Sequence, residues 1–264
     1  MHTKNQELGM SNAVVAGNWK MNGTVSDALR LVSDMKDELH RIPHVRKILF
    51  PPATALTSVA NLVYASSIEV GAQNMHHEMS GAFTGEISPA MVKESCSWVL
   101  LGHSERRVFF HESDEEIGKK LTAALENQIH PILCIGENVE QRESGKTQQI
   151  LRNQLSIATS KLKAFDGLTI AYEPVWAIGT GKAATIDIVE ETFVNLRSLM
   201  QAEWGTPSQS IPLMYGGSVN EANATVFGDS LLVSGLLVGG ASLSAQDFLS
   251  LTRQFADAKA SQNG

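Results

Sequence analysis

Four polar residues of complementary chemistry come directly after short apolar runs of this chain: Asn18, Lys20, His103 and Glu173. A carboxylate can remove a proton, an imidazole can polarise an oxygen, and an ammonium can stabilise developing negative charge. Each residue alone also has an ordinary role, since a histidine after a strand usually makes a structural hydrogen bond and a lysine there is usually solvated. Their joint occurrence at equivalent positions predicts an acid–base site.

Two glycine turns follow later apolar runs, as Gly216-Gly217-Ser218 and Gly239-Gly240. Glycine lets backbone N–H groups approach a ligand closely, and a helix N-terminus behind such a turn favours a phosphate. The formal net charge of the chain is -7. An anionic substrate therefore needs a locally positive site, and these turns together with Lys20 are predicted to supply it.

The segment Pro174-Val175-Trp176-Ala177-Ile178-Gly179-Thr180-Gly181-Lys182 follows Glu173 directly. A proline stiffens its first end and two glycines loosen its second end, which is typical of a hinged lid over an active site. Gly-Thr-Gly-Lys is not a nucleotide P-loop, because Trp176 stands where the first glycine is required and Ala183 where Ser or Thr is required.

Composition and motifs disfavour several classes of protein. His76-His77-Glu78 are adjacent and cannot easily converge on a metal, and the sequence lacks HExxH, CxxC and GxSxG, so we expect neither a metal site nor a hydrolase elbow. Without a basic cluster, nucleic acid is not an expected partner. No apolar run approaches the ~20 residues of a membrane helix. The two cysteines, Cys96 and Cys134, lie in apolar stretches, which favours a reducing, cytoplasmic location.

Eight short apolar runs alternate with longer amphipathic segments over the 264 residues. The runs lack polar alternation, as expected for strands buried on both faces. The predicted strands are Val14–Trp19, Ile48–Phe50, Ile68–Ala72, Trp98–Leu101, Pro131–Ile135, Thr169–Tyr172, Pro212–Tyr215 and Leu236–Val238. Predicted helices include Ser26–Arg41, Asp114–Asn127, Leu151–Lys163 and Asp187–Glu203, the second with a capping box at Ser113–Glu116.

This series predicts a single-domain α/β fold, a parallel eight-stranded (β/α)8 barrel with outer helices over residues 13–260. A doubly wound open sheet is the alternative, but no dinucleotide fingerprint follows the first strand. Residues 1–12 are polar and are expected to be a disordered or extended lead-in. In such a barrel the carboxyl ends of the strands meet at one mouth, so the polar residues named above are expected to converge there.

The motifs, taken together and in order, resemble the triosephosphate isomerase family across residues 13–257. They are Gly17-Asn18-Trp19-Lys20-Met21-Asn22-Gly23, Gly71-Ala72-Gln73-Asn74, Gly81-Ala82-Phe83-Thr84-Gly85-Glu86, Gly102-His103-Ser104-Glu105-Arg106-Arg107, the run from Ala171 to Lys182, Tyr215-Gly216-Gly217-Ser218-Val219 and Leu237-Val238-Gly239-Gly240-Ala241-Ser242-Leu243. The resemblance implies a cofactor-free enzyme that interconverts dihydroxyacetone phosphate and D-glyceraldehyde 3-phosphate.

The resemblance also implies a role for each matching residue. Glu173 is expected to be the base that moves a proton between two carbons, and His103 the electrophile that polarises the substrate oxygens. Lys20 is expected to supply fixed positive charge, and Asn18 a hydrogen bond. Ser104 and Glu105 are expected to support the site, while the phosphate is expected to contact Gly179, Ser218, Gly239 and Gly240.

A homodimer is a further implication of the resemblance, in which the loop Gln73–Gly85 reaches the partner's active site. The chain departs from the family pattern at three positions. Met79 replaces a common threonine at the tip of that loop, and Ala183 replaces a threonine after the lid. Ser234 replaces an aspartate that pairs with an arginine, here Arg197, so we expect that ion pair to be missing.

Two other readings of the sequence are a Schiff-base aldolase with Lys20 as nucleophile, and a catalytically inactive phosphate-binding barrel. The first predicts trapping of the substrate by borohydride. The second predicts loss of Glu173 or His103, and both residues are present.

Overall fold

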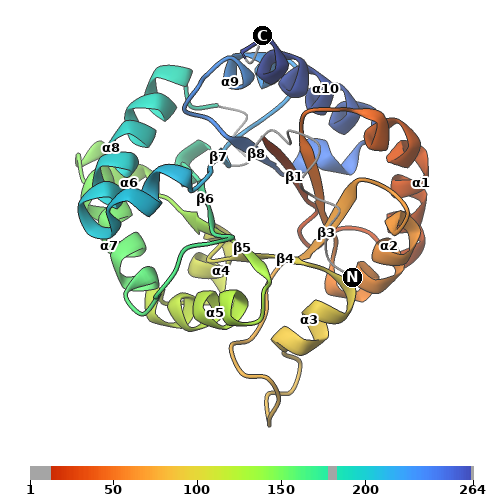
Figure 1. Cartoon of the computed structure of the whole chain (residues 1–264), viewed down its shortest axis with the longest axis horizontal. Helices are drawn as coiled ribbons and strands as arrows, with labels where there is room; N and C mark the ends of the chain where they lie inside the picture. The colour runs from red at the N-terminus through yellow and green to blue at the C-terminus, as the bar shows by residue number, and fades with distance from the viewer. Residues whose placement is uncertain (1–12, 178–182, 263–264) are drawn as a thin grey trace.

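The eight predicted strands form one closed parallel barrel in the order of the chain. The computed structural model describes residues 13–177 and 183–262, and the predicted lead-in 1–12 lies outside them. The strands are β1 Val14–Asn18, β2 Arg46–Phe50, β3 Ile68–Ala72, β4 Trp98–Leu101, β5 His130–Ile135, β6 Thr169–Tyr172, β7 Leu213–Tyr215 and β8 Gly235–Val238. Figure 1 looks down the barrel and shows the helices as an outer ring. The predicted fold is confirmed.

Strand β2 begins two residues earlier than the apolar run predicts, because the two basic side chains at its start have hydrogen-bond partners nearby. Lys47 is buried and its Nζ donates to the Ile42 carbonyl at 2.9 Å. Arg46 makes a bidentate pair with Glu69 of the neighbouring strand, at 2.8 and 2.9 Å. Burial of a basic residue is tolerated when its donors are paired.

The helices follow the predicted pattern, with shifts at their ends. The α-helices are α1 Val25–Arg41, α2 Leu56–Val63, α3 Pro89–Ser95, α4 Ser104–Phe109, α5 Asp114–Glu126, α6 Val139–Glu143, α7 Thr147–Thr159, α8 Ile186–Trp204, α9 Ala224–Gly228 and α10 Ala245–Ser261. The described residues also form short 3-10 segments, namely η1 Ala53–Ala55, η2 Val175–Ala177, η3 Thr206–Ser210 and η4 Gly240–Leu243. The capping box at Ser113–Glu116 is confirmed.

The caps explain where the predicted bounds of α7 and α1 were wrong. Helix α7 begins and ends four residues before the predicted span Leu151–Lys163. Its N-cap, Lys146, makes no side-chain capping bond, so the sequence carries no start signal there. Helix α1 begins before Ser26, because Thr24 and Asp27 form a reciprocal capping box.

Two apolar cores explain why the strands lack polar alternation. Side chains from alternate strand positions fill the barrel interior: Val14, Ala16, Ile48, Phe50, Trp98, Leu100, Ile132, Cys134, Ala171, Met214 and Leu237. The intervening residues, such as Val15 and Leu49, face the helices in a second, larger core. Each strand is thus buried on both faces and leaves polar residues only at its ends.

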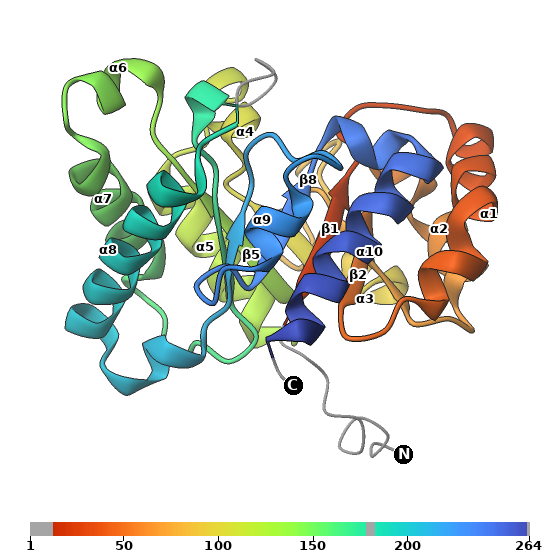
Figure 2. The ribbon, with the colours of Figure 1, turned by 90° about the horizontal axis from the view of Figure 1, so that it is seen from above.

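The carboxyl ends of the strands open on the side of the barrel where α4 and α6 lie, toward the top of Figure 2. Among residues 13–177 and 183–262, no helix is both long and apolar enough to cross a membrane. Both cysteines are free, and burial raises the pKa of the Cys96 thiol to about 12.

Candidate active site

The predicted polar residues meet in one cavity at the carboxyl ends of the strands. It has a volume of about 460 Å³. Asn18, Lys20, His103 and Glu173 line it, together with the glycine turns after β7 and β8. The barrel therefore brings together residues that lie up to 222 positions apart in sequence, from Asn18 to Gly240.

Glu173 follows β6 and is almost completely buried beside the start of α4. Its Oε2 accepts a hydrogen bond from the Ser104 backbone N–H at 2.9 Å, and its Oε1 lies 3.1 Å from His103 Nε2. Only 2% of the Glu173 side chain is exposed. A buried carboxylate beside an imidazole, with one backbone donor on it, has the geometry of an acid–base pair.

The tautomer of His103 follows from its second nitrogen. His103 is the N-cap of α4, and its Nδ1 accepts the Glu105 backbone N–H at 3.2 Å. The ring proton is therefore assigned to Nε2, the nitrogen that lies in the cavity toward Glu173. Gly102, with φ +71, turns the chain from β4 into this position, where Arg107 Nε binds its carbonyl at 2.7 Å.

Lys20 presents its ammonium to the cavity from a left-handed backbone conformation, with φ 54. Its Nζ donates to Glu105 Oε1 at 2.5 Å, and its backbone N–H donates to Asn18 Oδ1 at 3.0 Å. A non-glycine residue at positive φ costs on the order of 1–3 kcal/mol and needs support from its surroundings. Because Lys20 Nζ is engaged by a carboxylate, it is not presented as a free nucleophile, which disfavours the Schiff-base reading.

Gln73 supports the positive-φ backbone of Lys20, a role that was not predicted from the sequence. Its Nε2 donates to the Lys20 carbonyl and to the Phe50 carbonyl, both at 2.8 Å. The side chain thus links the ends of β1, β2 and β3 beneath Lys20. The signal available in the sequence was its position directly after β3, at the same mouth as the other residues.

The glycine turns lie on the side of the cavity reached from β7 and β8. A Cβ on Gly239 would sit 3.6 Å from Lys20 Cε, and one on Gly240 would meet nothing within 4 Å. After β7, helix α9 begins only at Ala224, so no helix starts directly at that glycine turn. After β8, the short 3-10 helix η4 starts within the turn itself, at Gly240. Ser218 Oγ donates to the Ala177 carbonyl at 2.8 Å.

The described part of the predicted lid is Pro174 to Ala177, while Ile178, Gly179, Thr180, Gly181 and Lys182 lie outside the described residues. The buried Glu137, which sequence reasoning also missed, holds the described part. Its Oε1 accepts from Tyr172 Oη and Trp176 Nε1, each at 3.0 Å, and pairs with Arg142 Nη1 at 3.2 Å. Burial, followed by the Glu137 charge, raises the pKa of Tyr172.

Gly136 directly follows β5 and packs against the backbone of Glu173, so a side chain there has no room. A Cβ at this position would lie 1.7 Å from the Glu173 carbonyl oxygen. We expect Gly136→Ala to lower the free energy of unfolding by about 1–3 kcal/mol and to lower kcat, because the displaced backbone carries Glu173. Urea unfolding and steady-state kinetics measure the two effects.

The control for this variant is Gly145→Ala. Gly145 has φ +69, and a Cβ there would contact nothing within 4 Å. That variant pays the left-handed backbone cost of alanine but makes no clash and no contact with the site. If Gly136→Ala were as stable and active as the wild-type protein, the close packing of Gly136 on the Glu173 backbone would not be what positions Glu173.

The departures from the family pattern lie in different parts of the barrel, since Met79 follows β3 and Ser234 directly precedes β8. Half of the Met79 side chain is exposed. Arg197 has no carboxylate partner among the described residues, and its Nη1 donates to the Ser208 carbonyl at 2.6 Å. Burial lowers the pKa of Arg197. We expect the barrel to be looser near β8 for lack of this ion pair, and that effect stays a prediction.

Within residues 13–177 and 183–262, no group of three or more His, Cys, Asp or Glu side chains is arranged to hold a metal ion. The cavity instead offers a carboxylate, an imidazole, an ammonium and backbone donors. This set of groups can move protons and stabilise an oxyanion.

Comparison with known proteins identifies the same family along nearly the whole chain. The triosephosphate isomerase family model matches residues 13–255. A triosephosphate isomerase of Dehalococcoides mccartyi is 46% identical over 94% of this chain and 98% of the relative. Those of Clostridium novyi and Alkaliphilus oremlandii are 43% and 42% identical, each over 92% of this chain and over 98% and 99% of the relative.

Proposed function

This chain belongs to the triosephosphate isomerase family, and from that premise we propose that it interconverts dihydroxyacetone phosphate and D-glyceraldehyde 3-phosphate. The observation that carries the proposal is the buried Glu173 carboxylate 3.1 Å from the His103 imidazole, in one cavity with Lys20. Such an enzyme serves glycolysis and gluconeogenesis.

In the proposed reaction, Glu173 takes a proton from the hydroxymethyl carbon of dihydroxyacetone phosphate. The electron pair of that C–H bond forms the enediolate, and Glu173 returns the proton to the neighbouring carbon. His103, which carries its proton on Nε2, donates to the substrate oxygens and relays a proton between them. Glu173 must first leave the Ser104 N–H, because that bond holds the unliganded carboxylate.

Lys20 and Asn18 are proposed to stabilise the enediolate oxygens, because both line the cavity beside His103. Ser104 and Glu105 support this arrangement, since they bind Glu173 and Lys20 respectively. The phosphate is proposed to occupy the side of the cavity at Ser218, Gly239 and Gly240, and to contact Gly179 as in the family motif. The reaction as written needs no cofactor.

We further propose that the protein acts as a homodimer. The loop between β3 and α3 projects away from the barrel (Figure 1), and its Met79 and Phe83 are exposed. A second cavity of about 420 Å³, lined by Lys20, Gln73 and Phe110 among others, lies beside it and borders the active site. The projecting loop of one copy and this cavity of another form a complementary pair.

A dimer of this kind depends on apolar contact at the loop. We expect Met79→Arg to shift the protein toward monomers, because the arginine charge would be buried in the dimer interface without a partner. Activity is expected to fall in proportion to the loss of dimer. Light scattering after size exclusion measures the mass. A variant that stays dimeric at micromolar concentration would place the interface elsewhere.

The two unpaired thiols favour a reducing compartment, and we propose the cytoplasm. The function itself is tested by coupling dihydroxyacetone phosphate formation from glyceraldehyde 3-phosphate to NADH oxidation. Rapid turnover supports the isomerase. A folded protein without turnover would support an inactive phosphate-binding barrel instead.

A further inference from the structure

Gln154 is a polar residue on the buried face of α7. Leu151, Leu155 and Ala158 are buried apolar residues that mark this face of the helix. Gln154 follows Leu151 by three positions and so lies on the same face, where its side chain is only partly exposed. A side-chain amide at such a position needs hydrogen-bond partners for its nitrogen and its oxygen, because an unpaired polar group is costly to bury.

Both partners of the Gln154 amide belong to one residue, Gly136, which directly follows β5. The Gly136 backbone N–H donates to Gln154 Oε1 at 2.8 Å, and Gln154 Nε2 donates to the Gly136 carbonyl at 3.0 Å. The side chain thus exchanges two hydrogen bonds with the backbone, as a residue of an antiparallel neighbouring strand would. Within residues 13–177 and 183–262, Gly136 makes its backbone hydrogen bonds to Gln154 and to no other residue.

Gly136 in turn packs against the backbone of Glu173. A Cβ on Gly136 would lie 1.7 Å from the Glu173 carbonyl oxygen and 2.6 Å from its carbonyl carbon. The residues on either side of Gly136 bind the same segment. The Glu173 N–H donates to the Ile135 carbonyl at 2.7 Å, and the Val175 N–H donates to the Glu137 carbonyl at 3.0 Å. The backbone that carries Glu173 is therefore held by the short stretch that has Gly136 at its centre.

The proposed reaction requires the Glu173 side chain to move while its backbone stays in place. The carboxylate must leave the Ser104 N–H, which it binds at 2.9 Å, before it reaches the substrate carbon. A misplacement of about 1 Å at a reacting group costs on the order of 10²-fold in rate. Groups that fix the Glu173 backbone therefore influence catalysis without touching the substrate.

We propose that Gln154 is a positioning residue for Glu173, because its amide fixes Gly136 and Gly136 fixes the backbone from which the carboxylate acts. This inference rests on the proposed role of Glu173 as the base. Gln154 does not line the cavity that holds Lys20 and His103, so it acts through Gly136. It also lies outside the glycine turns that are proposed to hold the phosphate.

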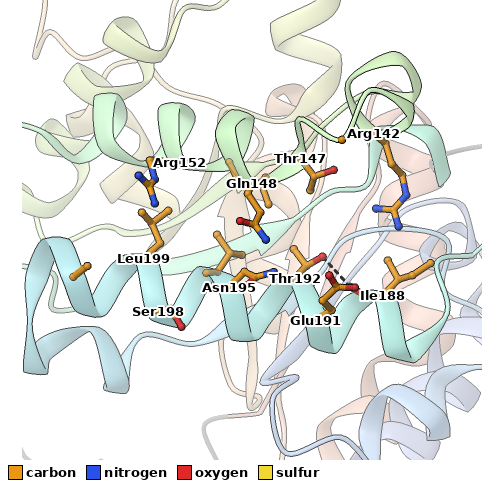
Figure 3. Close-up of a pocket in the computed structure, with 14 residues that line it drawn as sticks. Arg142, Thr147, Gln148, Arg152, Ile188, Glu191, Thr192, Asn195, Ser198 and Leu199 are labelled. Carbon is orange, nitrogen blue, oxygen red and sulfur yellow. Dashed lines mark hydrogen bonds between the residues drawn. The ribbon is translucent and has the colours of Figure 1, made fainter.

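The first test replaces Gln154 by methionine, which keeps the length of the side chain and removes both hydrogen bonds. We expect kcat to fall by at least about tenfold in both directions while KM changes by less than about twofold, because the base is misplaced and the phosphate side of the cavity is untouched. Gln148→Met is the matched control, since Gln148 is an exposed residue of α7 that lies in the groove between α7 and α8 (Figure 3). It is expected to keep the wild-type kcat. Circular dichroism verifies that each variant is folded at the assay temperature.

Gln154→Glu provides a second test, which depends on protonation. An ionised carboxylate accepts from the Gly136 N–H but repels the Gly136 carbonyl, whereas a protonated carboxyl has one donor and one acceptor, as the amide pair requires. Contact with the carbonyl favours the neutral form and raises the pKa of the introduced carboxyl above about 4.3. We therefore expect the ratio of variant to wild-type kcat to be low at about pH 8 and to rise toward one at about pH 5. Gln148→Glu is expected to keep a constant ratio.

Amide hydrogen exchange tests the same link without the isomerase assay. The Glu173 N–H is expected to exchange at least about tenfold faster in Gln154→Met than in the wild-type protein, and at an unchanged rate in Gln148→Met. A wild-type protein without turnover would overturn the proposed function, and this exchange would still decide whether Gln154 fixes the Glu173 backbone. Unchanged exchange at Glu173, a folded Gln154→Met enzyme within about twofold of wild-type kcat, or a Gln154→Glu ratio independent of pH would each overturn the proposal.

Discussion

Replacing Glu173 by glutamine is expected to lower kcat by about 10²–10⁴-fold while the protein stays folded, because an amide cannot accept the carbon-bound proton. The amide oxygen can still accept the Ser104 N–H that Glu173 Oε2 now binds at 2.9 Å. The bond to the start of α4 is thus preserved, although the amide nitrogen takes the place of the oxygen that lies 3.1 Å from His103 Nε2. Steady-state kinetics in both directions measure the effect.

Exchange with solvent follows the proton transfer itself. In deuterated water the wild-type protein is expected to place deuterium on the product carbon, and Glu173→Gln to do so at a rate reduced as much as kcat. Glu94→Gln, at an exposed position of α3, is the control for removing one carboxylate. A Glu173→Gln enzyme with more than a tenth of wild-type kcat would assign the base to another residue.

Lys20→Met is expected to lower kcat/KM by about 10²–10³-fold, since it removes the ammonium that balances the negative charge of the substrate and the enediolate. Methionine keeps much of the length and apolar body of the lysine side chain. Glu105, left without Lys20, has a side chain 39% exposed and can be solvated. The melting temperature is therefore expected to change little.

A second variant distinguishes the charge of Lys20 from its position. Glu105→Gln removes the partner carboxylate but keeps the ammonium and an oxygen that can accept from Lys20 Nζ. We expect it to retain much more activity than Lys20→Met. Equal losses in the two variants, or a Lys20→Met enzyme within tenfold of wild-type kcat/KM, would contradict a direct electrostatic role for the ammonium.

The barrel and the convergence of its polar residues could be read from the sequence because the barrel imposes a simple pattern. Strands buried on both faces leave continuous apolar runs, and the residues that end these runs must meet at one mouth. Asn18, His103 and Glu173 were therefore identifiable from position and chemical type before any contact was known. The family motifs added the expected role of each residue.

Other parts of the site depend on contacts that no local pattern encodes. Gln73 acts through carbonyls of β1 and β2, and Glu137 through a tyrosine, a tryptophan and an arginine from three separate segments. Both residues follow strand ends, but that position does not show which groups their side chains bind. The start of α7 was misplaced for a related reason, because Lys146 gives no side-chain cap and the helix is stabilised by packing.

Pairing of β1 with β8 has a consequence for synthesis of the protein on the ribosome. Val14 is in register with Gly235, so the barrel can close only when β8 is available to pair with β1. Lys20 emerges early, whereas the turn at Gly239 and Gly240 begins 219 positions later in the chain. The nascent polypeptide therefore carries no assembled site until that turn has emerged, and its strand edges stay unpaired throughout that interval.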